Sequence, residues 1–73
     1  MAEIKVESEI TGKVWKIEVG IGDRLEEDDP AMILESMKME IPVLAPAAGT
    51  VREILVREED AVEEGQVVAL LDG

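Results

Sequence analysis

The apolar residues of this chain occur in short runs, separated by segments rich in Gly, Asp, Glu and Pro. Residues 14–19, 32–34 and 67–71 contain such runs, and in residues 4–6 apolar and charged positions alternate. Short runs that end in turn-forming residues are typical of β-strands. Helical spacing is weak along the chain, and no run combines it with helix caps. The pattern therefore predicts an all-β protein whose first strand lies near residue 4.

The strand pattern occurs twice. When residues 12–35 are laid over residues 49–72 at an offset of 37, they align without a gap, and eight of the twenty-four pairs are identical. The identical pairs are Gly12/Gly49, Val14/Val51, Ile17/Ile54, Val19/Val56, Asp23/Asp60, Glu26/Glu63, Glu27/Glu64 and Leu34/Leu71. Two copies are too few for a solenoid, so the repeat predicts two similar halves related by a pseudo-twofold axis. Many short strands in 73 residues then indicate a small sandwich or flattened barrel.

Local irregularities repeat together with the halves. The apolar positions in residues 14–17 are separated by an odd spacing for a strand, and residues 51–54 repeat that spacing. We therefore expect a β-bulge or an irregular start in both strands. Asp28 aligns with Gly65, and because both residue types tolerate a left-handed backbone, this pair is expected to share one turn geometry. Trp15, the one aromatic residue, aligns with an arginine, which predicts a half-exposed position.

Composition narrows the classes of function. We expect residues 1–73 to form a single domain, because this length suits one small core. The formal net charge of −11 predicts no binding to nucleic acid or to anionic membranes, and attraction to basic protein surfaces. The chain has no cysteine and no histidine, and its acidic clusters lack the spacing of a calcium loop. We therefore expect no metal site and read these clusters as solvated charge.

Lys38 lies in the middle of the stretch ESMKME, which falls between the two halves. Residues 32–35 and 40–44 have the character of strands, so the residues between them are expected to form a hairpin with Lys38 at or near its tip. A surface lysine is most often only a solvated charge. Glu35 and Glu40 should keep this lysine protonated, which makes it a poor catalyst. It would serve better as an acceptor for another enzyme, which can remove the proton in its own site.

This hairpin and repeat resemble the biotinyl/lipoyl attachment domain family. The stretch from Ser36 to Met39 is similar to the family motif Ala-Met-Lys-Met, and the stretch 45–49 is similar to the family's Ala-Pro-x-x-Gly step. The resemblance implies a flattened β-barrel of two four-stranded antiparallel sheets, a barrel-sandwich hybrid, with the modified lysine on a hairpin tip. It implies that Lys38 is the cofactor-attachment site. It further implies that a ligase recognises Glu35, Ser36, Met37, Met39 and Glu40. The ungapped repeat leaves no room for the thumb insertion of some family members.

The function that the resemblance implies is that of a carrier, not of an enzyme. Biotin would be attached to Lys38 by a biotin protein ligase and would act as a swinging arm. It would carry CO2 between a biotin carboxylase and a carboxyltransferase. We expect a free-standing, cytoplasmic monomer.

Two alternatives stay open from the sequence alone. The domain could carry lipoate, or accept both cofactors from biotinylating and lipoylating enzymes. It could instead be an unmodified acidic β-domain that only binds a basic partner, in which case Lys38 never reacts.

Overall fold

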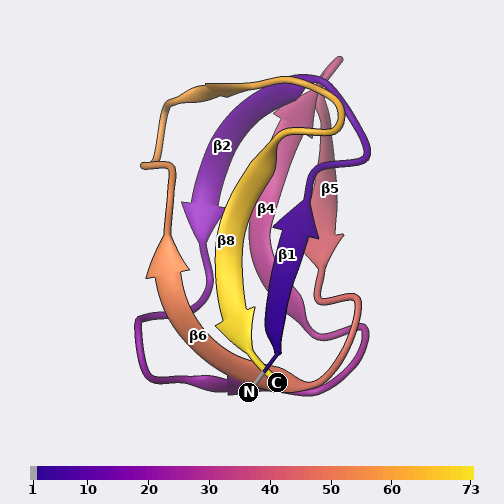
Figure 1. Cartoon of the computed structure of the whole chain (residues 1–73). Helices are drawn as coiled ribbons and strands as arrows, with labels where there is room; N and C mark the ends of the chain where they lie inside the picture. The colour runs from indigo at the N-terminus through magenta and orange to yellow at the C-terminus, as the bar shows by residue number, and fades with distance from the viewer. Residues whose placement is uncertain (1) are drawn as a thin grey trace.

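The protein forms two antiparallel β-sheets, as described for residues 2–73 by a computed structural model (Figure 1). The strands are β1 (Glu3–Glu7), β2 (Gly12–Ile17), β3 (Arg24–Leu25), β4 (Pro30–Ser36), β5 (Met39–Leu44), β6 (Gly49–Ile54), β7 (Ala61–Val62) and β8 (Val67–Asp72). One sheet has the strand order β1-β8-β6-β3, and the other has the order β5-β4-β2-β7. The expected all-β fold of two four-stranded sheets is confirmed. Within residues 2–73, no helix is long and apolar enough to cross a membrane.

The core lies between the two sheets and is almost entirely aliphatic. Side chains alternate between the two faces of a strand, so residues two apart along a strand point toward the same face, and the apolar ones on the inner face form the core. The buried apolar residues are Val6, Val14, Leu25, Ala31, Met32, Leu34, Val43, Ala45, Val51, Val56, Val62, Val68, Ala69 and Leu71. The buried polar side chain of Ser8 is satisfied, because its hydroxyl donates to the Ile10 carbonyl at 2.6 Å.

The pseudo-twofold symmetry includes all eight strands. The offset of 37 carries β2, β3 and β4 onto β6, β7 and β8, and it also carries β1 onto β5. It therefore converts one sheet order into the other. The last correspondence was absent from the sequence alignment, which began at residue 12, although residues 3–6 read EIKV and residues 40–43 read EIPV.

Both expected bulges are present. The β2–β4 ladder shifts register at Trp15, and the β6–β8 ladder shifts register at Arg52. At a bulge, two residues of one strand face a single residue of its neighbour. Trp15 therefore faces outward and is 47% exposed, which confirms its expected half-exposed position.

The expected shared turn geometry is confirmed as well. Asp28 and Gly65 have positive φ angles of 70° and 84°. The N–H of Asp29 donates at 3.1 Å to the carbonyl of the residue three positions before it, and Gln66 makes the same contact at 3.0 Å. The side chains of Asp29 and Gln66 also accept a hydrogen bond from the backbone N–H of that earlier residue, at 2.9 Å and 3.0 Å. Some acidic residues of the loops thus close turns in addition to carrying charge.

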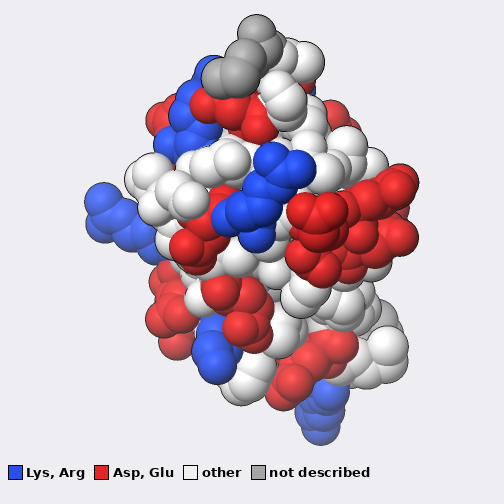
Figure 2. Space-filling view, turned by 90° about the horizontal axis from the view of Figure 1, so that it is seen from below, with Lys and Arg blue, Asp and Glu red and all other residues white. Residues whose placement is uncertain are grey.

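The hairpin and the chain ends lie at opposite ends of an elongated molecule. Its principal extents are 36 × 19 × 18 Å. The β4–β5 hairpin projects at the top of Figure 1, and both termini lie at the bottom. Figure 2 views the molecule from that lower end, where acidic side chains form several groups and the Lys and Arg side chains stand apart from one another. The tip of the hairpin is therefore free of the regions through which the chain enters and leaves the fold.

Candidate functional site

The hairpin between β4 and β5 ends in a two-residue turn formed by Met37 and Lys38. Ser36 pairs with Met39 immediately before and after this turn. Met37 and Lys38 have φ angles of 52° and 65°. Two central residues with positive φ define a type I′ turn, whose twist matches that of paired strands. The expectation that Lys38 lies at the hairpin tip is confirmed.

The turn holds its two residues in a conformation that they do not favour by themselves. A left-handed backbone costs a residue with a side chain roughly 1–2 kcal/mol, and type I′ turns usually contain Asn and Gly. The strands compensate for this cost, because β4 is an interior strand that pairs with both β5 and β2. The paired strands thus present the two side chains outward. Met37 is 92% exposed, and Lys38 is exposed too.

Strand β2 supports the base of the hairpin at very short range. A Cβ atom on Gly12 would lie 2.7 Å from the carbonyl oxygen of Glu35, which is closer than such atoms normally approach. A Cβ atom on Gly49 would lie 2.8 Å from the carbonyl oxygen of Asp72 in the other half. Only glycine permits this approach. The same close approach in both halves thus explains why both copies of the repeat begin with glycine.

The charges near the tip are mostly acidic. Glu35 and Glu40 face each other across the hairpin, and both are exposed. Lys38 makes no ion pair with any residue in 2–73. Lys13 is the register partner of Glu35, but its Nζ lies 3.0 Å from Glu59. The hydrogen bond and charge of Glu59 raise the pKa of Lys13, with a smaller contribution from the charge of Glu35.

The residues expected at the site all lie on this hairpin. Glu35 and Ser36 end β4, Met37 and Lys38 form the turn, and Met39 and Glu40 begin β5. Met39 is 59% exposed, so neither methionine of the motif belongs to the core. A cluster of exposed apolar side chains around an unpaired lysine suits recognition by another protein. The sequence pattern did not assign Lys13 or Trp15 to the site, and both lie on β2, the strand that pairs with β4.

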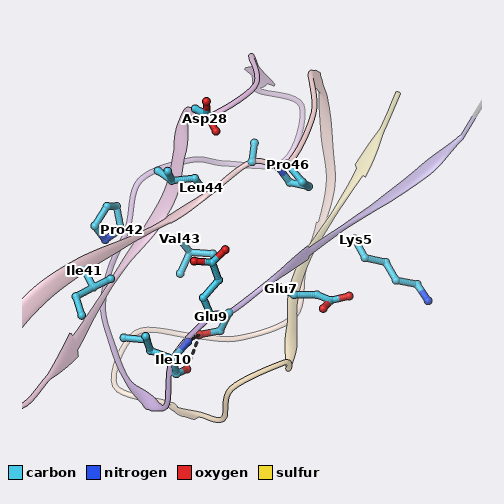
Figure 3. A pocket seen from close by; sticks show the side chains of 12 residues that line it. Lys5, Glu7, Glu9, Ile10, Asp28, Ile41, Pro42, Val43, Leu44 and Pro46 are labelled. Atoms are coloured by element: carbon cyan, nitrogen blue, oxygen red, sulfur yellow. Dashed lines mark hydrogen bonds between the residues drawn. The ribbon is translucent and has the colours of Figure 1, made fainter.

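A separate groove of about 460 Å³ lies between the edge strands β1 and β5 (Figure 3). Its lining comes mainly from residues 5–10 and 41–46, and it does not include Lys38. Glu7 and Glu9 lie on the β1 side, whereas the β5 side presents apolar residues such as Ile41 and Pro42. Within residues 2–73, no three acidic side chains come together in a group that could hold a metal ion.

Comparisons with known proteins assign the family. Residues 2–71 match the family model of biotin and lipoyl domains, which is described as "Biotin-requiring enzyme". The chain is 44% identical over 63 residues to a biotin/lipoyl attachment protein of Bacillus subtilis, covering 86% of each chain. It is 42% identical over 71 residues to a biotinylated protein TB7.3 homologue of Mycobacterium leprae, covering 97% of this chain and 99% of that one. The chain therefore belongs to the biotin/lipoyl attachment domain family.

A solved structure supports the fold assignment. The urea carboxylase of Kluyveromyces lactis contains a region that superimposes on 99% of this chain with a TM-score of 0.92 and 38% identity. The chain spans only 6% of that enzyme's length. The family resemblance inferred from the hairpin motif is thus confirmed, and biotin is the cofactor that this family's model names.

Proposed function

We propose that the protein is a biotin carrier and that Lys38 is its attachment site. The observation that carries this proposal is an exposed, unpaired lysine on a two-residue hairpin turn in a chain of this family. In the proposed cycle, a biotin protein ligase modifies Lys38. A biotin carboxylase then loads CO2 onto the attached biotin, and a carboxyltransferase removes it. Carboxylases containing such a domain, including the urea carboxylase above, support this assignment.

Attachment requires Lys38 Nζ to act as a nucleophile toward the activated carboxyl carbon of biotin. The amide bond forms as the bond to the activating group breaks, and the amine must lose its proton. No side chain of residues 2–73 forms an ion pair with Lys38 Nζ through which it could take the proton, so we expect the ligase to remove it. Acylation then removes one positive charge and moves the formal net charge from −11 to −12. Bound biotin supplies the site for carrying CO2, whereas the protein supplies position and tether.

The residues around Lys38 would be read by the ligase. Met37 and Met39 expose apolar surface that the fold does not use, and Met adapts readily to a partner surface. Glu35, Ser36 and Glu40 complete the proposed recognition segment. Their positions at the ends of two paired strands keep the tip in one geometry.

The test is modification of the full chain by a purified biotin protein ligase with ATP and biotin. Intact mass should rise by one biotinyl group, and labelled avidin should detect the product. The Lys38→Arg variant keeps the charge without an acylatable amine and should remain unmodified. Lys16→Arg, which changes another exposed lysine, is the matched control and should be modified normally. Avidin binding by the Lys38→Arg variant would assign the acceptor to another lysine.

A lipoyl carrier is the second candidate. The name of the Bacillus subtilis relative, biotin/lipoyl attachment protein, favours this candidate. Incubation with a lipoylating enzyme and lipoate, followed by intact mass, distinguishes the two cofactors on the same preparation. An unmodified mass in both reactions would leave the third reading, an acidic domain that only binds a basic partner.

A further inference from the structure

Arg52 joins two opposed carboxylates in the half of the molecule that lacks the hairpin lysine. Glu3 on β1 and Asp72 on β8 face each other across the ladder. The guanidinium of Arg52 donates from Nη1 to Asp72 Oδ1 at 3.3 Å and from Nη2 to Glu3 Oε1. Like charges directly opposite each other destabilise a sheet, and the arginine fork relieves this repulsion.

The half that carries Lys38 has the same two carboxylates without the arginine. The offset of 37 carries Asp72 onto Glu35 and Glu3 onto Glu40, which also face each other. It carries Arg52 onto Trp15. No side chain of residues 2–73 forms an ion pair or a hydrogen bond with the carboxylate of Glu35 or Glu40. The nearest candidate in register, Lys13, is engaged with Glu59.

The bulge gives Trp15 the position from which Arg52 reaches its carboxylates. Both residues are the extra residue of their strand, and both are exposed on an outer sheet face. An arginine at this place is compatible with the fold, because the other half has one. In the hairpin half, the equivalent position therefore carries an aromatic ring, and the two equivalent carboxylates make no ion pair within residues 2–73. An aromatic face attracts a cation, and a guanidinium can stack on the ring while it donates to carboxylates.

We propose that Trp15, Glu35 and Glu40 form a receptor for an arginine side chain of the biotin protein ligase. The inference rests on the proposed function, since it assigns the partner to the enzyme that modifies Lys38. The guanidinium of the ligase lies against Trp15 and bridges the two carboxylates, in the arrangement that Arg52 adopts inside the chain. The net charge of −11 draws a basic surface toward the domain. The bound arginine brings Lys38 and the exposed methionines to the ligase.

The first test exchanges the residues of the two halves. Trp15→Arg should place a guanidinium between Glu35 and Glu40 from within the chain and so block the receptor. We expect the KM of the ligase for this protein as its substrate to rise about tenfold with little change in kcat, since a charge-assisted contact is worth on the order of this factor. The free energy of unfolding should not fall. Arg52→Trp is the matched control and should leave KM unchanged. An unchanged KM in the Trp15→Arg variant overturns the inference.

The second test does not depend on ligase activity. Trp15 is the single aromatic residue, so its fluorescence reports on the receptor alone. Hexa-arginine should change this fluorescence at a several-fold lower concentration than hexa-lysine, at equal ionic strength. The Glu35→Gln, Glu40→Gln double variant should remove the difference between the peptides. Equal responses to the two peptides refute a guanidinium receptor.

The outcomes separate this inference from the proposed function. If intact mass shows biotin on Lys38 while both tests fail, the carrier function stands and the arginine receptor does not. If the ligase never modifies the wild-type chain, the carrier function fails. In that case the peptide titration still decides whether the receptor binds a guanidinium.

Discussion

Leu34 and Leu71 occupy equivalent places in the two halves of the core, and truncating each to alanine tests whether the symmetry is also energetic. Both side chains are fully buried, with no exposed surface. Leu34 is flanked by Val14 and Ile41 on its neighbouring strands. Its counterpart is flanked by Val51 and by Ile4. The same pair of residue types therefore surrounds each leucine.

The expected cost of each truncation is large for a domain of this size. Leu→Ala at a fully buried site costs about 2–5 kcal/mol, through lost burial and the cavity that remains. A domain of 73 residues has a total stability of roughly 4–11 kcal/mol. Each variant should therefore lose a large part of its free energy of unfolding. Because their neighbours match, the two losses should agree to within about 1 kcal/mol.

Urea denaturation measures both losses. Unfolding should be followed by circular dichroism and independently by Trp15 fluorescence, with the slope m compared between variants to check two-state behaviour. Leu55→Ala is the control, since that side chain is 45% exposed and should cost well under 1 kcal/mol. A several-fold difference between Leu34→Ala and Leu71→Ala would show that equivalent positions are not energetically equivalent. It would also weaken inferences that use one half as a template for the other.

Two further outcomes are expected. Changing Met37 to Asp and Met39 to Ala should lower biotinylation strongly and stability little, because both side chains are exposed and Asp tolerates a left-handed turn better than Met; an equal fall in ligase kinetics and in urea midpoint would contradict this. Residues 1–38 and 39–73, made as separate peptides, should each be unfolded by circular dichroism, because each sheet combines strands from both segments. The full chain should unfold in one cooperative step, and a stably folded half would count against interlocked halves.

Much of the local structure was predictable because the same local sequence pattern occurs in both halves. The odd spacing after Val14 and Val51 predicted both bulges, which the register confirms. The pairing of Asp28 with Gly65 predicted a shared left-handed turn, since few residue types tolerate that conformation. The position of ESMKME between two strand patterns predicted the hairpin and its lysine. Spacing and turn chemistry act over a few residues, so they can be read without knowledge of the fold.

The tertiary structure decided what depends on contacts between distant strands. The left-handed conformation of Met37 and Lys38 has no cause in their own preferences, and it follows from the register in which β4 and β5 pair. The equivalence of β1 and β5 follows from the strand order of the two sheets, although the similarity of residues 3–6 to residues 40–43 is already present in the sequence. The sequence aligned Trp15 with Arg52, but only the tertiary structure shows that Arg52 bridges Glu3 and Asp72 and that the equivalent residues Glu35 and Glu40 also face each other. Local patterns specify elements, whereas the neighbours of a side chain follow from how sheets assemble.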